Sequence, residues 1–413
     1  MMKLRIFLWI TCSYLLAFPA LAGGPTYSRF GIGSLLLFGG GRIDAMGGSG
    51  IGLIGDRFIN RLNPAGLARI SLTRFSGGFE YSRVSSEDAL GSSTYARGSF
   101  AGLAFAIPIS TEHGIVWSME SSPYSLVNYS IQRDDNQQGV QSTLTYTGSG
   151  GLSTLGTGLS WSVTDQLSLG LKLNYLYGRT RQVARFDFSD LSFIDSEISK
   201  SRFHSGFLVS GGLIYEGLSD LLNAPSLKTF TLGAILSSPA SVSMNDEDIL
   251  TTTNSFDTTR TSSSSFNLPL AAGLGFSYTF SNRYLLAGDV SSQFWSSTNL
   301  APVGTSEFRN SSRYSLGMEI MPERDIDNYF RRVAYRIGVS YHSTYISVNG
   351  RPINEFYFTG GMGFPMGFDS RLNVGLHVGF RGTASDGLQK DMMYRLTFSV
   401  SASEAWFLKI EED

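Results

Sequence analysis

Cysteine is almost missing from this chain. Among its 413 residues the one cysteine is Cys12, which lies in an apolar run near the N-terminus. The rest of the chain therefore has no disulfide, no thiol chemistry and no cysteine-bound metal. Histidine is nearly as scarce, with four residues whose spacing fits no metal motif. We expect neither a metal site nor a cofactor.

Motifs for covalent chemistry and for phosphate binding are missing as well. None of the histidines stands in a nucleophile motif; they are His113, His204, His342 and His377. The glycine-rich stretch "GGGRIDAMGGSG" (39–50) lacks the Lys-Ser/Thr pair with which a phosphate-binding loop ends. We therefore expect a protein that is not an enzyme.

Charge and long apolar runs are also in short supply. Charged residues make up 16% of the chain and the formal net charge is −2, so nothing points to nucleic acid as a partner. Beyond residue 22, no segment approaches the run of about 20 apolar residues that a transmembrane helix needs. Glycine is abundant instead, at 47 residues, and aromatic residues reach 13%. This composition is typical of an outer-membrane β-barrel.

The N-terminus predicts export. Lys3 and Arg5 precede the apolar run "IFLWITCSYLLAF", and Pro19 is followed by Ala20 and Ala22 at the small-residue positions of a signal-peptidase site. We interpret residues 1–22 as a cleaved signal peptide. The alternative is an uncleaved membrane anchor, which the proline and the Gly-Gly-Pro that follows argue against.

Alternation of side chains predicts the strands. In "RLNVGLHVGF" (371–380) and "VAYRIGVSYH" (333–342), apolar residues occupy one face, and small or polar residues occupy the other. Comparable segments lie near 72–84, 95–109, 114–132, 140–163, 166–187, 202–216, 227–244, 266–280, 283–298, 309–321, 332–343, 354–364, 371–381 and 392–402. They predict an all-β fold, a transmembrane antiparallel barrel of about fourteen strands over residues 72–413.

The connections alternate between short and long, as periplasmic turns and external loops do in such barrels. The longest, residues 245–266, is a Ser/Thr/Asp tract that we expect to be a mobile external loop. From about residue 403 the chain forms a tail containing Trp406 and Phe407. These aromatics belong either to the interfacial belt, to an assembly signal, or to a tail packed on the rim.

Residues 23–71 do not alternate, and we interpret them as a plug, or hatch, inside the lumen. Their glycines allow close backbone packing, and their charged residues can meet polar walls. The charged residues are Arg42, Asp44, Asp56, Arg57 and Arg61. The plug ends in "INRLNPAGLARI" (59–70), where Asn63 can cap a short helical turn that begins with Pro64 and Ala65.

Residues 40–70 resemble the N-terminal hatch of the FadL/OMPP1/TodX family of outer-membrane transporters. The resemblance rests on "GRIDAMGGSGIGL", followed by the Asn-Pro-Ala turn and then the first strand. Members of that family are fourteen-stranded barrels that import long-chain fatty acids or aromatic hydrocarbons. The resemblance implies a Gram-negative outer membrane, contact with its lipid, and a hydrophobic ligand.

The resemblance also implies a kink in the third strand that opens the wall sideways. The segment 114–132 carries Ser122 and Pro123 in its middle, and proline cannot donate to a strand ladder. The alternative is that Pro123 lies in an external extension of this strand.

The predicted lumen face departs from the apolar pockets of that family. It is polar, and its residues include Asp289, Glu319, Arg336, Asn373, His377 and Arg395. Glu319 and Arg336 fall on neighbouring strands and can pair across the wall or hold the hatch. The best candidates for an apolar ligand contact are Leu35, Leu36, Leu37 and Phe38, which can equally form the core of the plug.

Two functions follow. The first is passive uptake of hydrophobic small molecules, with sideways exit near the third strand. The second is a FadL-like barrel that serves an outer-membrane secretion or assembly machine, as in Bacteroidetes-type relatives that this chain resembles. The second function predicts other outer-membrane proteins as partners.

Overall fold

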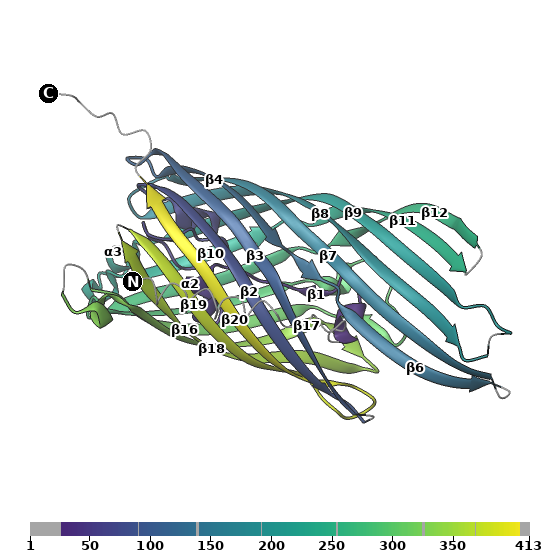
Figure 1. Cartoon of the computed structure of the whole chain (residues 1–413). Coiled ribbons are helices and arrows are strands. Elements are labelled where there is room, and N and C mark those ends of the chain that lie inside the picture. The colour runs from purple at the N-terminus through teal and green to yellow at the C-terminus, as the bar shows by residue number, and fades with distance from the viewer. Residues whose placement is uncertain are drawn as a thin grey trace, which may run out of the picture.

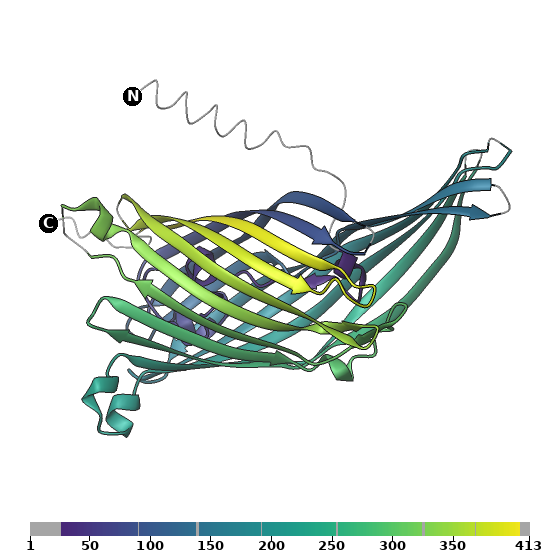
Figure 2. The same ribbon diagram turned by 90° about the horizontal axis from the view of Figure 1, so that it is seen from below.

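A computed structural model describes residues 26–89, 91–137, 140–190, 192–252, 255–323, 327–367 and 369–404. The predicted signal peptide and the aromatic pair Trp406 and Phe407 lie outside these residues. The chain forms a closed antiparallel barrel of fourteen strands, which confirms the fold expected from side-chain alternation (Figures 1 and 2).

The strands stand in the barrel wall in the order in which they occur in the chain, and each is joined to the next as an antiparallel hairpin. Its first half comprises β2 (Thr73–Glu87), β3 (Ser92–Ser110), β4 (Ile115–Pro123) with β6 (Tyr129–Gln137), β7 (Val140–Ser162), β8 (Leu167–Phe188) and β9 (Ser196–Tyr215). The second half comprises β10 (Phe230–Ser237) with β11 (Ala240–Thr252), β12 (Ser255–Leu268) with β13 (Ala271–Phe280), β14 (Tyr284–Gln293), β15 (Ser306–Phe308) with β16 (Ser311–Ile320), β17 (Ala334–Val348), β18 (Arg351–Gly367), β19 (Ser370–Gly382) and β20 (Lys390–Glu404). The ring closes where β20 pairs with β2.

Proline accounts for three of the interrupted strands. Pro123 ends β4, Pro239 separates β10 from β11, and Pro269 separates β12 from β13. Each lacks the N–H that a ladder position requires, so pairing breaks or bends there. Short helices lie in the connections: α3 (Leu218–Leu221), η3 (Pro225–Leu227), η4 (Trp295–Ser297) and η5 (Tyr329–Arg332).

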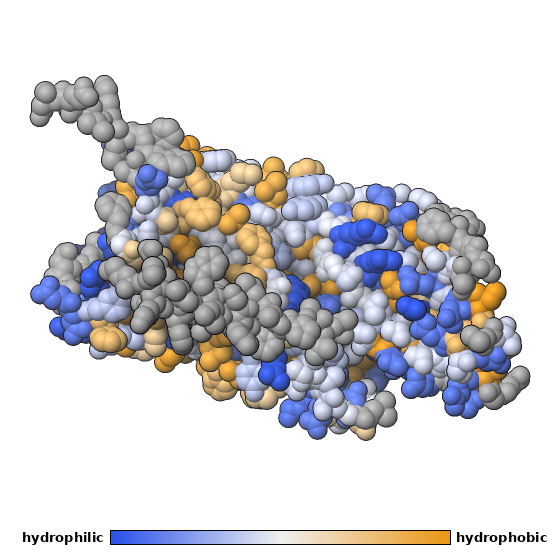
Figure 3. Space-filling view, in the orientation of Figure 1, coloured by the Kyte–Doolittle hydropathy of each residue, from blue (hydrophilic) through white to orange (hydrophobic). Residues whose placement is uncertain are grey.

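The outer face of the barrel is apolar. On β8, Leu169, Leu171 and Leu173 are exposed, whereas the alternate residues Ser168 and Asn174 are buried on the lumen side. Apolar side chains gather over β2, β3 and β4, and polar ones prevail where β6 to β9 run out to one end (Figure 3). Within the described residues, none of the helices is long and apolar enough to cross a membrane.

The expectation of a long loop at 245–266 is wrong. Residues 245–252 and 255–266 belong to β11 and β12, which pair from Ala240↔Leu268 to Thr252↔Ser255. Threonine is β-branched and fits a pleated sheet well, so a Ser/Thr tract can form a hairpin. Six strands, β6 to β9 with β11 and β12, therefore run past the rest of the barrel (Figures 1 and 2). We call this part the six-stranded extension.

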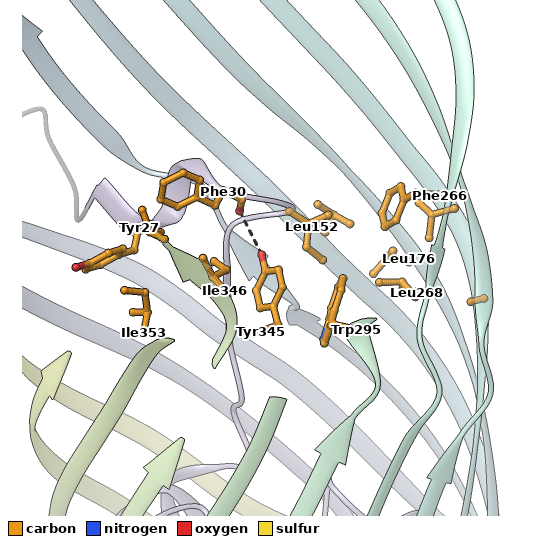
Figure 4. Packing of buried hydrophobic residues seen from close by; sticks show 14 of the residues in the cluster. Tyr27, Phe30, Leu152, Leu176, Phe266, Leu268, Trp295, Tyr345, Ile346 and Ile353 are labelled. Atoms are coloured by element: carbon orange, nitrogen blue, oxygen red, sulfur yellow. Dashed lines mark hydrogen bonds between the residues drawn. The ribbon is translucent and has the colours of Figure 1, made fainter. Parts of the chain in front are cut away.

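Residues 26–72 lie within the barrel and are called the inner segment. It contains η1 (Thr26–Arg29), β1 (Ser34–Leu35), α2 (Gly41–Ala45) and η2 (Pro64–Leu67), and β1 pairs with the two-residue strand β5 (Ser125–Leu126). Near the extension, Tyr27 and Phe30 join an apolar cluster with Trp295 and Tyr345 (Figure 4). The hydroxyl of Tyr345 donates to the carbonyl oxygen of Phe30 at 3.2 Å.

Candidate functional site

A buried ion network joins α2 to the wall. Glu319 accepts from Arg42 Nε at 2.8 Å and from Arg336 Nε at 2.9 Å, and Arg336 Nη1 donates to Asn373 Oδ1 at 2.8 Å. Glu319 is only 2% exposed and Arg336 only 4%. The sequence left two roles open for Glu319 and Arg336, and Glu319 performs both: it pairs across the wall and binds the inner segment.

Asp289 binds the backbone of the inner segment. Its Oδ2 accepts from the N–H groups of Gly50 and Ile51 at 2.6 and 2.9 Å. Close approach is possible because the facing wall positions are glycines: a Cβ at Gly338 would lie 2.3 Å from the nitrogen of Gly47. The small lumen-facing residues therefore leave space for a folded segment, not for an open channel.

The Asn-Pro-Ala turn forms η2 and lies against β8 and β9. Asn63 is fully buried; its Oδ1 accepts from the nitrogen of Ala65 at 3.0 Å, and its Nδ2 donates to the carbonyls of Ile51 and Leu213 at 2.8 and 3.1 Å. The Asn63 side chain thus caps the turn, and it also joins the turn to another part of the inner segment and to the barrel wall.

We expect Asn63→Ala to destabilise this region by about 1–3 kcal/mol, because buried backbone groups lose their partners. Amide hydrogen exchange over residues 60–70 of the detergent-solubilised protein measures the effect. The matched control is Asn328→Ala, since Asn328 caps η5 in the same way, through Phe330, but is exposed. Equal exchange in the two variants would contradict the prediction.

Three further ionic contacts were not anticipated from the sequence. Glu120 accepts from Lys172 Nζ at 2.8 Å and lies 3.5 Å from Arg61 Nε. Arg74 of β2 pairs with Asp369 at the opposite end of the chain. Alternation could have placed Glu120 and Lys172 on the lumen face, but only the register shows that they meet.

A cavity of about 210 Å³ remains between the inner segment and the wall. Leu35, Leu36 and Leu37 line one side; Phe38 does not line it and lies under the Arg61 guanidinium at 5.2 Å. The other side is charged and polar, lined among others by Asp44, Glu80, Arg97, Arg313, His342, Glu355, Tyr357, His377, Arg381 and Arg395.

Several polar atoms at this cavity are left without a partner. Asp44 Oδ2 and His377 Nε2 are buried and have no hydrogen-bond partner among the described residues. Arg395 Nε also has no hydrogen-bond partner among these residues, because the nearest carboxylate oxygen, Oε2 of Glu80, lies 3.7 Å away. The cavity is therefore lined by apolar and by charged side chains together, with Val84, Leu126 and Met393 adding to the leucines.

Backbone pairing of the wall is interrupted at the third strand. β3 pairs with β4 only from Leu103↔Ser121 to Ser110↔Ile115, and over the described residues β6 pairs with β7 alone. Pro123 ends β4 opposite Ser153, and Ser122 Oγ lies 3.2 Å from Thr154 Oγ1. The inner segment borders the interruption, where the nitrogen of Leu36 donates to the carbonyl of Tyr124 at 2.9 Å.

A fourteen-stranded barrel with a segment folded into its lumen defines the class: an outer-membrane-type β-barrel protein. The family model described as BamG matches residues 1–412, and the chain belongs to the BamG family. The resemblance to the FadL/OMPP1/TodX family therefore holds at the level of the fold, because the matching family is a different one.

Solved structures share this fold at low sequence identity. A Pseudomonas aeruginosa FadL homologue is 14% identical with a TM-score of 0.60, covering 90% of this chain and 99% of that one. The Ralstonia pickettii toluene transporter TbuX is 14% identical with a TM-score of 0.57, covering 88% and 98%. The CymD monoaromatic hydrocarbon channel is 15% identical with a TM-score of 0.55, covering 94% and 99%. Comparison with curated protein sequences gives no match.

Proposed function

We propose that this protein is a component of an outer-membrane machine that assembles or secretes other proteins. The observation that carries the proposal is the way the lumen is filled. The inner segment is bound to the wall through Glu319, Asp289 and Asn63, and the space that remains is small and carries several charged side chains beside its apolar ones. A barrel filled in this way serves as a rigid membrane-embedded partner more readily than as a conduit for apolar molecules.

Three further features support this role. The chain belongs to the BamG family, not to the family of the hydrocarbon channels whose fold it shares. The inner segment acts as a plug, which keeps the outer membrane sealed while the barrel holds its partners. The six-stranded extension adds surface beyond the membrane-spanning wall (Figure 2).

Purification in mild detergent from its own outer membrane tests the proposal. Mass spectrometry is applied both to the co-eluting proteins and to the organic extract. We expect protein partners in fixed stoichiometry and no stoichiometric apolar ligand. A stoichiometric fatty acid or hydrocarbon without any protein partner would overturn the proposal.

The second candidate function is uptake of hydrophobic small molecules. The observation that favours it is the run Leu35 to Leu37 beside the cavity, next to the interrupted wall at Pro123. A molecule held by these leucines would have a route sideways into the bilayer, where apolar groups are stable.

If the protein carries out uptake, Leu35→Asp combined with Leu37→Asp should lower the entry of radiolabelled oleate and toluene by about tenfold. The reason is that a charge would replace the apolar side of the cavity. Leu221→Asp is the control, because Leu221 is 68% exposed on α3 outside the lumen. Unchanged uptake in the double variant would remove the support that the leucines give to this function.

A further inference from the structure

The six-stranded extension has two unlike faces. Its lumen-side face carries a row of apolar residues in register across five strands: Ile131 on β6, Tyr146 on β7, Ala184 on β8, Ile198 on β9 and Leu250 on β11. Tyr146 is 43% exposed and Ile198 is 46% exposed. Apolar side chains held in a row and open to solvent are typical of a contact surface.

The outward face at the same level is polar. It carries Gln132 and Asp134 on β6, Thr145 on β7, Arg185 on β8 and Thr251 on β11. The apolar row is therefore not part of the lipid-facing band, because lipid contact would place apolar residues outward.

The apolar row lies on the same side of the sheet as the buried core of the barrel, and a band of ion pairs, Lys200 and Arg202 of β9 with Asp246 of β11, separates the two. Leu152 of β7 and Leu176 of β8 lie on the same face of their strands as Tyr146 and Ala184, and both are 1% exposed within the cluster around Tyr345. Inside the barrel this face is covered by the inner segment and the facing strands. Past the end of the facing strands, among the described residues, Tyr146 and Ile198 have no such cover.

The row ends at an open edge. Over the described residues β6 pairs with β7 alone, from Tyr129↔Gly148 to Gln137↔Val140, so every second residue of β6 directs its N–H and C=O groups away from the sheet. Only an extended polypeptide matches the regular spacing of these groups, and lipid or sugar does not.

We propose that β6 receives an extended segment of a partner protein, which adds to the extension as a further strand. Side chains of the added strand alternate between the two faces: apolar ones extend the row beside Ile131, and polar ones lie beside Gln132. Arg133 is exposed on the apolar face, so an acidic residue of the partner strand fits opposite it. This inference rests on the proposed function, since it supplies the contact surface for a partner.

Site-specific photo-crosslinking in the full chain, in its own outer membrane, tests the inference. A benzoylphenylalanine replaces Tyr146, and in a matched control it replaces Thr145 on the opposite face of the same strand. We expect a polypeptide adduct at position 146 and at least about tenfold less at 145. The cross-linked peptide should alternate between apolar and polar residues.

A second variant keeps the test independent of folding. Ile198→Asp should lower the adduct at position 146 by about tenfold, because a charge interrupts the row. Thr251→Asp, on the outward face of β11, should leave it unchanged. Retained heat-modifiable migration in gels shows that each barrel is folded.

The outcomes separate this inference from the proposed function. Partner proteins that co-purify with the unaltered chain, without an adduct at position 146, would leave the machine role standing and overturn the contact surface. An adduct with lipid only, an adduct with a second copy of this chain, or an adduct unaffected by Ile198→Asp would overturn it as well. Absence of both partners and adduct would overturn both proposals.

Discussion

Replacing Glu319 with alanine is expected to free α2 from the barrel wall. The substitution leaves Arg42 and the buried Arg336 without their shared carboxylate. Removing one partner of a buried ion pair costs about 3–5 kcal/mol, because the remaining charge has no compensation. The inner segment should then sample a displaced state, seen as ion conductance of the purified barrel in planar bilayers and as entry of bulky antibiotics into cells.

The control for Glu319→Ala is Glu216→Ala. Glu216 pairs with Arg69 at 2.9 Å, but both side chains are partly solvent-exposed, at 28% and 43%. An exposed pair is worth at most about 1 kcal/mol, so this variant should stay sealed. If both variants conduct equally, or if neither variant conducts, the network around Glu319 does not hold the inner segment in place.

Deleting residues 26–66 is expected to have the largest effect, a permanently open barrel. The wall closes on itself through β2 and β20, so it keeps its backbone pairing without the inner segment. The exposed lumen charges, such as Asp289 and Glu120, would be hydrated by the water that enters. A fourteen-stranded lumen without contents passes small polar solutes.

Antibiotic sensitivity and steady bilayer conductance measure this effect, with the heat-modifiable band showing that the barrel folds. Deletion of residues 218–227, which form α3 and η3 outside the lumen, is the control. Unchanged sensitivity in a folded barrel that lacks residues 26–66 would contradict the role of the inner segment as a plug.

The sequence was sufficient for those features that depend on local pattern. Two-residue alternation gave the strands and their number, and "NPAG" gave the turn capped by Asn63, because both are set by neighbouring residues. The same patterns misplaced the tract 245–266. Its polarity suggested a loop, whereas pairing between β11 and β12 makes it a hairpin whose first strand lies beside β9.

The contacts of the candidate site depend on register and on distant parts of the chain. Alternation places Glu319, Arg336 and His377 on the lumen face, but it does not give their height in the barrel. Arg42 meets Glu319 across 277 residues of sequence, and Gly50 meets Asp289 across 239. Glu120, Lys172 and Glu355 were missed for the same reason: their partners lie on other strands or in the inner segment.

The most direct test of the proposed machine role is depletion of the protein from its own cell. Quantitative proteomics of the outer membrane and uptake of radiolabelled oleate and toluene are followed together as the protein disappears. The proposed role predicts that other outer-membrane or secreted proteins decline while uptake of both compounds stays the same. Loss of uptake with an unchanged outer-membrane and secreted proteome would contradict it and establish the barrel as a transporter.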